Sequence, residues 1–222
     1  GALILEDFGD ATFTRILAGT PAEERVLYEL ATDVLIGLHR VRPDRAVPEG
    51  LELYNHKRLL DEAMLLFDWY CPAVMGQRAS VVAQREFVMA WLGTAFMGLS
   101  DLPPTLVLRD FHVDNLAVRE TGEGIARCGL LDFQDALEGP RAYDLMSLLE
   151  DARRDVPPEL ARAMTERYLA AFPDLSRAQF MSDFAILAAQ RHAKVIGIFT
   201  RLLARDGKPD YLVHIQRVWR RL

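Results

Sequence analysis

The sequence predicts an α+β fold that is mostly helical and holds a small β-hairpin. Apolar residues recur at helical spacing over most of the 222 residues, and short β-prone runs replace this pattern between residues 104 and 133. Half of the residues are hydrophobic, which is enough for the core of one large domain or two small ones.

The chain opens with a short apolar segment, and a long amphipathic helix follows it. The apolar residues before Glu6 are too few for a signal peptide or a membrane span and are typical of a strand entered midway. Thr20, Pro21 and Glu23 form a capping box with proline at the first helical position, and apolar residues then repeat at helical spacing as far as Leu38.

Helical patterns cover most of the remaining chain. After a proline- and charge-rich loop at about 42–50, two helices are expected over about 55–70 and 80–97, with breaks at Pro72 and Gly76. Four further helical segments are expected over 143–151, 158–172, 178–204 and 209–222.

The β-prone runs cover residues 105–108, 116–118 and 128–131, and a turn at 121–124 separates the last two. This spacing predicts a hairpin.

Three polar residues flank this hairpin in an order that suits magnesium-dependent phosphoryl transfer. Asp110 precedes Asn115 by five residues, and Asp132 follows the third β-prone run. Asp110 can accept a hydroxyl proton, while Asn115 and Asp132 each offer an oxygen to Mg²⁺. Single Asp and Asn residues are common in loops because they bond to nearby backbone, so the prediction depends on the combined order.

Charge and cysteine content narrow the partners. A net charge of -6 and a pI near 5.4 speak against nucleic acid or an anionic membrane as the main partner and favour a small soluble substrate. Cys71 and Cys128 are far apart and form no Cys-x-x-Cys pair, so we expect a cytoplasmic protein without a disulfide framework or a zinc site.

The motifs resemble those of the aminoglycoside phosphotransferase and choline kinase family, which shares the protein-kinase-like fold. Its catalytic loop has the form His-x-Asp-x-His-x-x-Asn; Asp110, His112 and Asn115 match the last three fixed positions, and Asp132 matches the metal-binding Asp. Leu108 stands where the family usually has a His that braces the loop, which questions the rigidity of the loop more than its chemistry.

Within that family, the chain is most similar to bacterial kinases that act on N-acetylmuramate and N-acetylglucosamine at the anomeric hydroxyl. The segments that carry this likeness are 131–136, 139–140, 143–145, 147–149, 190–191 and 194–199. The resemblance implies that Arg109, His112 and Asp144 support the catalytic loop. For Arg109, a surface position or a charge-balancing role near Asp110 are alternatives. For Asp144, the alternative is an ordinary acidic residue in a first helical turn.

The resemblance also implies a domain plan and a nucleotide site. Residues 1–10 would be the last strand and hinge of an N-terminal lobe that is otherwise largely absent from this chain, and 11–222 a helical C-terminal lobe. Within that lobe the resemblance gives the catalytic loop as 108–116, the metal-binding segment as 130–136 and the acceptor-site helices as about 143–222. ATP would be held through the backbone of Glu6, Asp7 and Phe8, and the side chains of Ala117 and Leu131 would floor the base pocket.

Four residues are candidates for acceptor binding. Asp135 follows the metal-binding segment, where a solvated or capping acid is an equal alternative. Gln190, Arg191 and Lys194 share one face of the long helix, which could hold a carboxylate or sugar hydroxyls or could be an ordinary solvated basic face.

The expected function is ATP- and Mg²⁺-dependent phosphorylation of a hydroxyl on a small molecule, an amino sugar or a cell-wall sugar. Choline, ethanolamine or aminoglycosides are alternative acceptors. A metal-dependent phosphohydrolase, built on Asp110, His112, Asp114 and Asp132, and a non-catalytic module are alternatives of another class. The sequence leaves the oligomeric state open.

Overall fold

The structure of the chain, a computed structural model, describes residues 6–222. These residues form two compact units, each made of three stretches of chain. The first unit holds residues 6–51, 104–149 and 156–174, and the second holds 52–103, 150–155 and 175–222. Residues 1–5, and with them most of the apolar start of the expected strand, lie outside the described residues, while residues 6–8 have no regular structure.

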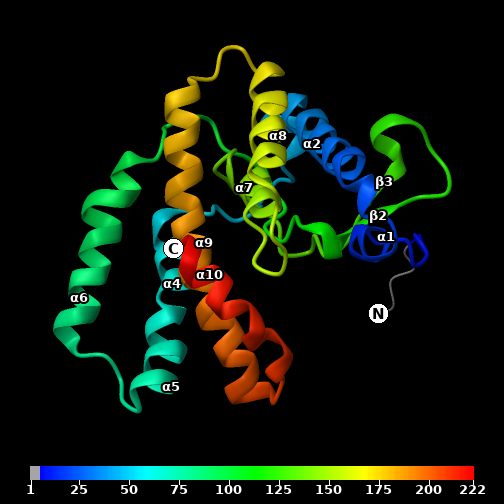
Figure 1. The fold of residues 1–222 in the computed structure, drawn as a ribbon. Coiled ribbons are helices and arrows are strands. Elements are labelled where there is room, and N and C mark those ends of the chain that lie inside the picture. The colour runs from blue at the N-terminus through cyan, green and yellow to red at the C-terminus, as the bar shows by residue number, and fades with distance from the viewer. Residues whose placement is uncertain (1–5) are drawn as a thin grey trace. The chain divides into compact units, whose positions relative to one another are not determined.

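Helices make up most of the first unit, as the sequence predicts (Figure 1). They are α1 Phe13–Gly19, α2 Glu24–Arg40, α3 Pro43–Ala46, α7 Tyr143–Leu149 and α8 Pro158–Ala170, with 3₁₀ turns at Pro21–Glu23, Val113–Asn115 and Gly124–Arg127. α2 and α8 lie side by side, and all seven residues of α7 are buried. α7 therefore belongs to the core of this unit.

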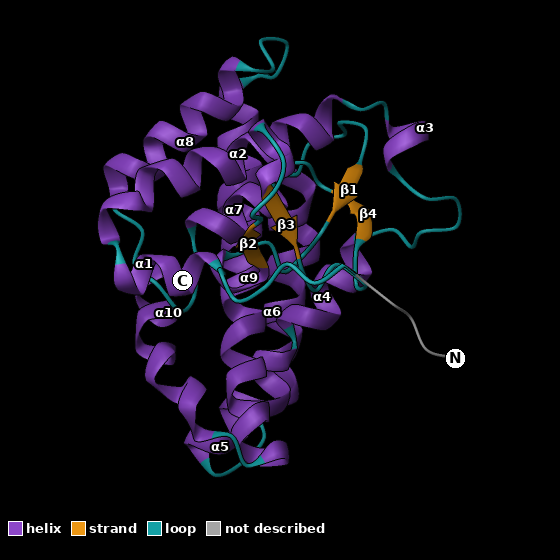
Figure 2. Ribbon diagram, turned by 90° about the vertical axis from the view of Figure 1, so that its right-hand side faces the viewer, coloured by secondary structure: helices purple, strands orange, loops and turns teal. Residues whose placement is uncertain are grey.

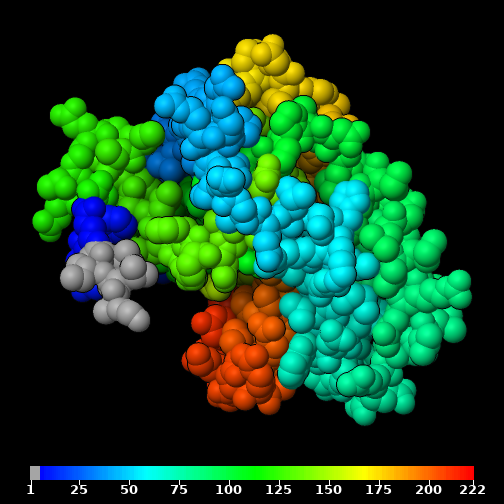
Figure 3. Space-filling model, turned by 180° about the vertical axis from the view of Figure 1, so that it is seen from behind, coloured from blue at the N-terminus to red at the C-terminus, as the bar shows by residue number. Residues whose placement is uncertain are grey.

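The strands of the first unit form two antiparallel pairs (Figure 2). They are β1 Thr105–Val107, β2 Leu116–Val118, β3 Cys128–Leu130 and β4 Leu137–Gly139. β2 and β3 form the predicted hairpin, with Leu116 opposite Leu130, whereas β4 pairs with β1 and was not predicted. The chain near Ala11 lies against β2, because its carbonyl accepts a hydrogen bond from the Val118 N–H at 2.8 Å; Figure 3 shows the N-terminal segment in blue beside the green hairpin region.

The second unit is helical throughout its regular structure. It contains α4 His56–Ala63, α5 Cys71–Met75, α6 Val81–Ala90, α9 Arg177–Asp206 and α10 Ile215–Arg221, with π turns at Leu66–Tyr70 and Trp91–Ala95 and 3₁₀ turns at Phe96–Gly98 and Pro209–His214. The 30-residue α9 contacts α4, α10 and the π turn before α5. Gly197 permits the close approach, because a Cβ there would lie 2.3 Å from the Leu65 carbonyl carbon.

None of the described helices is both long and apolar enough to cross a membrane.

Two local expectations are wrong. Thr20 does not cap the long helix with its side chain: it ends α1 instead, donating its N–H to the Ile16 carbonyl, and α2 begins only after a 3₁₀ turn. Pro72 does not break the helical path, because it lies in the first turn of α5, where a missing N–H costs little. Gly76 does end that helix, with a left-handed φ of +69°.

Candidate active site

The loop that carries Asp110 is anchored by a buried carboxylate. Asp144, in the first turn of α7, is fully buried, and its two oxygens accept hydrogen bonds from the N–H groups of Leu108 at 2.7 Å and Arg109 at 2.9 Å. Backbone donors of this kind stabilise an ionised carboxylate away from water. Because α7 is part of the core, these bonds fix the start of the loop.

Arg109, directly before Asp110, holds an uncommon backbone conformation. Its φ is +69°, a region that costs a residue with a side chain about 1–3 kcal/mol. The Ser147 hydroxyl donates to its carbonyl at 3.3 Å, and its own guanidinium donates to the Asp135 carbonyl at 3.2 Å. Backbone and side-chain contacts therefore hold this conformation from both α7 and the segment after β3.

The structure brings Asp110, Asn115 and Asp132 together. The Asn115 amide nitrogen donates to the Asp110 carbonyl at 3.0 Å and lies 3.5 Å from Asp132 Oδ2. The Leu131 N–H donates to the Asn115 carbonyl at 2.9 Å, which ties the end of β3 to the loop. Both contacts are made by the amide nitrogen, so the amide oxygen of Asn115, the atom that binds hard cations, takes no part in them.

His112 and Asp114, two residues of the phosphohydrolase alternative, do not form a metal-binding cluster. His112 is buried, and the Thr14 hydroxyl of α1 donates a hydrogen bond to the Asp114 carboxylate. Over residues 6–222, no group of three or more His, Cys, Asp or Glu side chains is placed to hold a metal ion. The carboxylate and imidazole cluster that the phosphohydrolase alternative requires is therefore not assembled.

The N-terminal segment and the residues that follow β2 line a partly open cavity of about 320 Å³. Its lining residues are Glu6, Asp7, Phe8, Gly9, Arg119, Glu120 and Thr121. Arg119 donates to the Glu6 carboxylate at 2.6 Å, and its guanidinium lies 5.4 Å from the centre of the Phe8 ring. The three expected nucleotide-binding residues thus share one cavity with Arg119, which sequence reasoning missed because nothing in a short β-prone run distinguishes an arginine at its end.

Two other residues expected at the base pocket do not line this cavity. Ala117 is fully buried, and Leu131 is 38% exposed. Gly129, on β3 opposite Ala117, lies against the Phe8 ring, where an added Cβ would come within 2.5 Å of the ring.

The polar face of α9 is buried, so the alternative of a solvated basic face is wrong, and the proposed contact with an acceptor stays a prediction. Gln190, Arg191 and Lys194 are each at most 4% exposed. The Gln190 amide donates to the Leu59 carbonyl at 2.8 Å, and the Lys194 ammonium lies 2.9 Å from the Glu62 carboxylate. The physical reason is that α4 covers this face of α9. Asp135, by contrast, is exposed.

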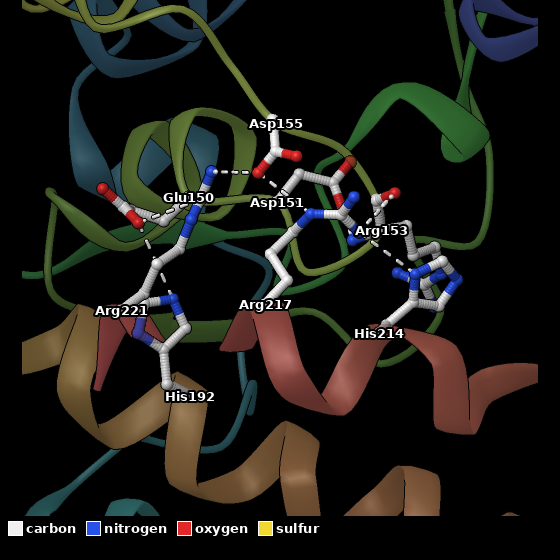
Figure 4. A network of polar contacts seen from close by, with 8 residues as sticks. All are labelled: Glu150, Asp151, Arg153, Asp155, His192, His214, Arg217 and Arg221. Carbon is white, nitrogen blue, oxygen red and sulfur yellow. Dashed lines mark hydrogen bonds and ion pairs between the residues drawn. The ribbon is translucent and has the colours of Figure 1, made fainter. Parts of the chain in front are cut away.

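A polar network in the second unit was not predicted (Figure 4). Glu150 accepts a hydrogen bond from Arg221 at 3.0 Å, and Asp155 accepts one from Arg217 at 2.9 Å. His192 Nε2 lies 3.8 Å from the Glu150 carboxylate. Burial, and then the charges of nearby arginines, lower the pKa of His192 to about 4. The network joins α10 to residues 150–155.

Comparison with known proteins gives the chain a family context. Residues 1–181 match the model of a family described as the phosphotransferase enzyme family. A curated N-acetylmuramate/N-acetylglucosamine kinase of Caulobacter vibrioides is 36% identical over 225 residues, covering 99% of this chain and 61% of the relative. Kinases of the same name from Pseudomonas aeruginosa and Neisseria meningitidis serogroup B are 33% and 34% identical and cover 100% of this chain, which spans 64% and 68% of their lengths.

Solved structures add a likeness of fold. A gentamicin complex of APH(2'')-IIa has a TM-score of 0.55 and covers 98% of this chain and 68% of its own. The ADP-bound aminoglycoside phosphotransferase APH(2'')-Ib has a TM-score of 0.52 and covers 98% of this chain and 70% of its own. Both are 16% identical to this chain, so the likeness shows the fold alone.

Proposed function

The chain belongs to the phosphotransferase enzyme family, and from this premise we propose that it carries the base and the metal ligands of a small-molecule kinase. The reaction is transfer of the γ-phosphoryl group of ATP to a hydroxyl. The observation that supports it best is the position of the Asn115 amide, bonded to the Asp110 carbonyl and next to Asp132.

Asp110 takes the role of base in this proposal. Its carboxylate orients the acceptor hydroxyl and takes its proton, so that the hydroxyl oxygen can form a bond to the γ-phosphorus as the bond to the ADP oxygen breaks. The anchored loop favours this role, because phosphoryl transfer depends mainly on position and charge.

Asn115 and Asp132 would hold Mg²⁺ through the amide oxygen and the carboxylate. One carboxylate and one amide suit this ion, which is usually bound by few protein oxygens together with substrate phosphates and water. When bound, the ion neutralises charge on the phosphates.

The cavity beside Phe8 is the proposed adenine site. Backbone groups of Glu6, Asp7 and Phe8 would pair with the base, and Arg119 would brace the cavity through Glu6 and the Phe8 ring. Ala117, a buried residue of β2, and Leu131, directly after β3, would contribute to the floor under the base without lining this cavity.

An amino sugar or cell-wall sugar is the proposed acceptor. The support is the name shared by the curated relatives, which are 33–36% identical, against 16% for the aminoglycoside phosphotransferases of known structure. Of the four candidates for acceptor binding, three lie in the buried α4–α9 contact and would support the acceptor site from there: Gln190, Arg191 and Lys194. Asp135 is exposed and would contact the acceptor directly.

The test is an acceptor screen with the full-length protein, read as ADP formed. N-acetylmuramate and N-acetylglucosamine should give ADP in proportion to phosphorylated sugar, while choline and aminoglycosides should give much less. ADP formation with choline or an aminoglycoside alone would move the acceptor assignment to that class. Phosphate release from simple esters without any acceptor would refute the kinase proposal.

A further inference from the structure

Gln134 contacts the proposed metal ligand directly. Its amide nitrogen donates to Asp132 Oδ1 at 2.6 Å. We infer that Gln134 is a positioning residue that orients the Asp132 carboxylate for Mg²⁺ and so sets the affinity of the metal site. This inference rests on the proposed function, because it concerns the same metal ligand.

The two oxygens of Asp132 have different amide neighbours. Oδ1 accepts from Gln134, and Oδ2 faces the Asn115 amide nitrogen at 3.5 Å. One donor on each oxygen restricts rotation of the carboxylate and leaves its remaining lone pairs for a cation. Both partners are neutral, so they orient the carboxylate without cancelling the charge that attracts a metal.

Asp132 needs such a partner because little else holds it. β3 ends at Leu130, and Asp132 itself is exposed with a left-handed φ of +57°. An exposed carboxylate outside a strand has several rotamers of similar energy. The amide donors therefore decide which of them is populated, and the shorter contact is the one from Gln134.

The backbone that carries Gln134 is fixed on both sides. Before it, the Leu131 N–H donates to the Asn115 carbonyl at 2.9 Å. After it, the Asp135 carbonyl accepts from Arg109 at 3.2 Å, and the Ala136 N–H closes a turn onto the Phe133 carbonyl at 3.0 Å. These bonds fix the backbone on both sides of Gln134 and so keep its Cα close to Asp132.

Residues that hydrogen-bond to metal-ligating side chains have a measurable effect on metal affinity. Removing one typically weakens metal binding about 10–100-fold. Gln134 is exposed, so its replacement leaves the core intact and separates an effect on the metal from an effect on folding.

The experiment compares Gln134→Met with Gln77→Met in the full-length protein. Methionine keeps an unbranched side chain but removes the donor; Gln77 is also exposed and lies in the other unit. Mn²⁺ is titrated in the presence of ADP and followed by electron paramagnetic resonance. We expect Gln134→Met to raise the Mn²⁺ dissociation constant at least about tenfold and Gln77→Met to leave it unchanged. The melting temperature of both metal-free variants should match that of the wild type.

A second variant tests whether the length of the side chain at position 134 matters for the contact with Asp132. Gln134→Asn retains the amide but is one methylene shorter, so it should lose the contact and weaken Mn²⁺ binding as methionine does. Wild-type Mn²⁺ affinity in either Gln134 variant would overturn the inference, as would an equal loss in Gln77→Met. Failure of the proposed function would look different: the wild type would form no ADP with any acceptor, whereas the Mn²⁺ titration needs no acceptor.

Discussion

Arg109 and Asp132 are the non-glycine residues with a left-handed backbone in the described part of the chain, and both border the candidate site. One directly precedes Asp110, and the other is the proposed metal ligand. Such conformations persist only where surrounding contacts impose them, and they gather at functional sites. At Arg109 those contacts come from Asp144 and Ser147 of α7 and from the carbonyl of Asp135.

Asp110→Asn tests the base. The amide keeps the size of the side chain but cannot take a proton, so we expect phosphorylation of the acceptor to fall by about 10²–10⁴-fold. The affinity for ATP should stay close to that of the wild type, since Asp110 makes no proposed contact with the metal or with adenine. Turnover within a few-fold of wild type, measured as ADP formed by the full-length protein, would rule out this role.

Asp132→Ala tests the metal ligand. Loss of the only carboxylate in the proposed ligand set should weaken Mg²⁺-dependent nucleotide binding by at least about tenfold. This is the smallest effect expected, because removal of a residue that merely supports a ligand already weakens metal binding by about that factor. Calorimetric titration of ADP with and without Mg²⁺ separates the affinity that depends on the metal from the affinity for the nucleotide alone. The metal-free affinity should be unchanged; an equal loss without Mg²⁺ would point to a structural role instead.

Asp144→Asn addresses the anchor of the loop. An amide can accept only through its oxygen, so one of the two N–H groups, of Leu108 or Arg109, loses its acceptor. Hydrogen bonds to a charged group contribute about 1.5–3 kcal/mol, and we expect a loss of that size in the free energy of unfolding by urea. Ser147→Ala, which removes the longer 3.3 Å contact, should cost less. A smaller effect for Asp144→Asn than for Ser147→Ala would contradict the anchor.

The sequence predicted this residue-scale chemistry unevenly. The proximity of Asp110, Asn115 and Asp132 could be predicted, because their order along two loops is itself the signal, and their chemical roles stay predictions. The contacts of Arg119 with Glu6 and of Gln134 with Asp132 could not, because the sequence alone does not show which acidic side chain each of them bonds. The burial of Lys194 was missed for a similar reason: its partner Glu62 lies on α4, far away in the sequence.

At the scale of elements, the strong periodic patterns and the β2–β3 hairpin were predicted, whereas the β1–β4 pairing and the short helix α1 were not. The hairpin of β2 and β3 and the helices α8 and α9 follow the expected ranges within a few residues. β4 escaped prediction because Leu-Glu-Gly is not β-prone; β1 recruits it as a partner. α1 escaped because its seven residues are too few for a periodic signal.

Gly197→Ala tests the packing of α9 in the second unit. A methyl group there would meet backbone atoms at Leu65 at 2.3–2.4 Å, so α9 would have to move away. We expect a loss of about 1–3 kcal/mol in the free energy of unfolding. Gly19→Ala is the matched control, because nothing lies within 4 Å of the added methyl group. A loss in the control as large as at Gly197 would show that the methyl group, rather than the close approach, is responsible.

At the scale of the whole molecule, each unit buries a histidine in its neutral form. In the first unit, burial and then the charge of Arg141 lower the pKa of His39 to about 3, and Tyr168 lies 2.6 Å from its Nδ1. In the second unit, burial and then the charges of Arg191 and Arg221 lower the pKa of His192 to about 4. In both units, therefore, a buried histidine stays neutral at a pH at which an exposed histidine would bind a proton.

Stability should fall as the pH drops below about 6.5. In that range the unfolded chain binds a proton at each histidine while the folded chain does not, so acidification stabilises the unfolded state relative to the folded state. Each histidine contributes roughly 1.4 kcal/mol per pH unit, down to its folded pKa near 4 for His192 and near 3 for His39. Replacement by glutamine removes the proton that the unfolded state would bind. Urea unfolding between pH 7 and 4 should therefore show a shallower pH dependence for His39→Gln and for His192→Gln than for the wild type. An unchanged slope in both variants would mean that other groups control the acid response.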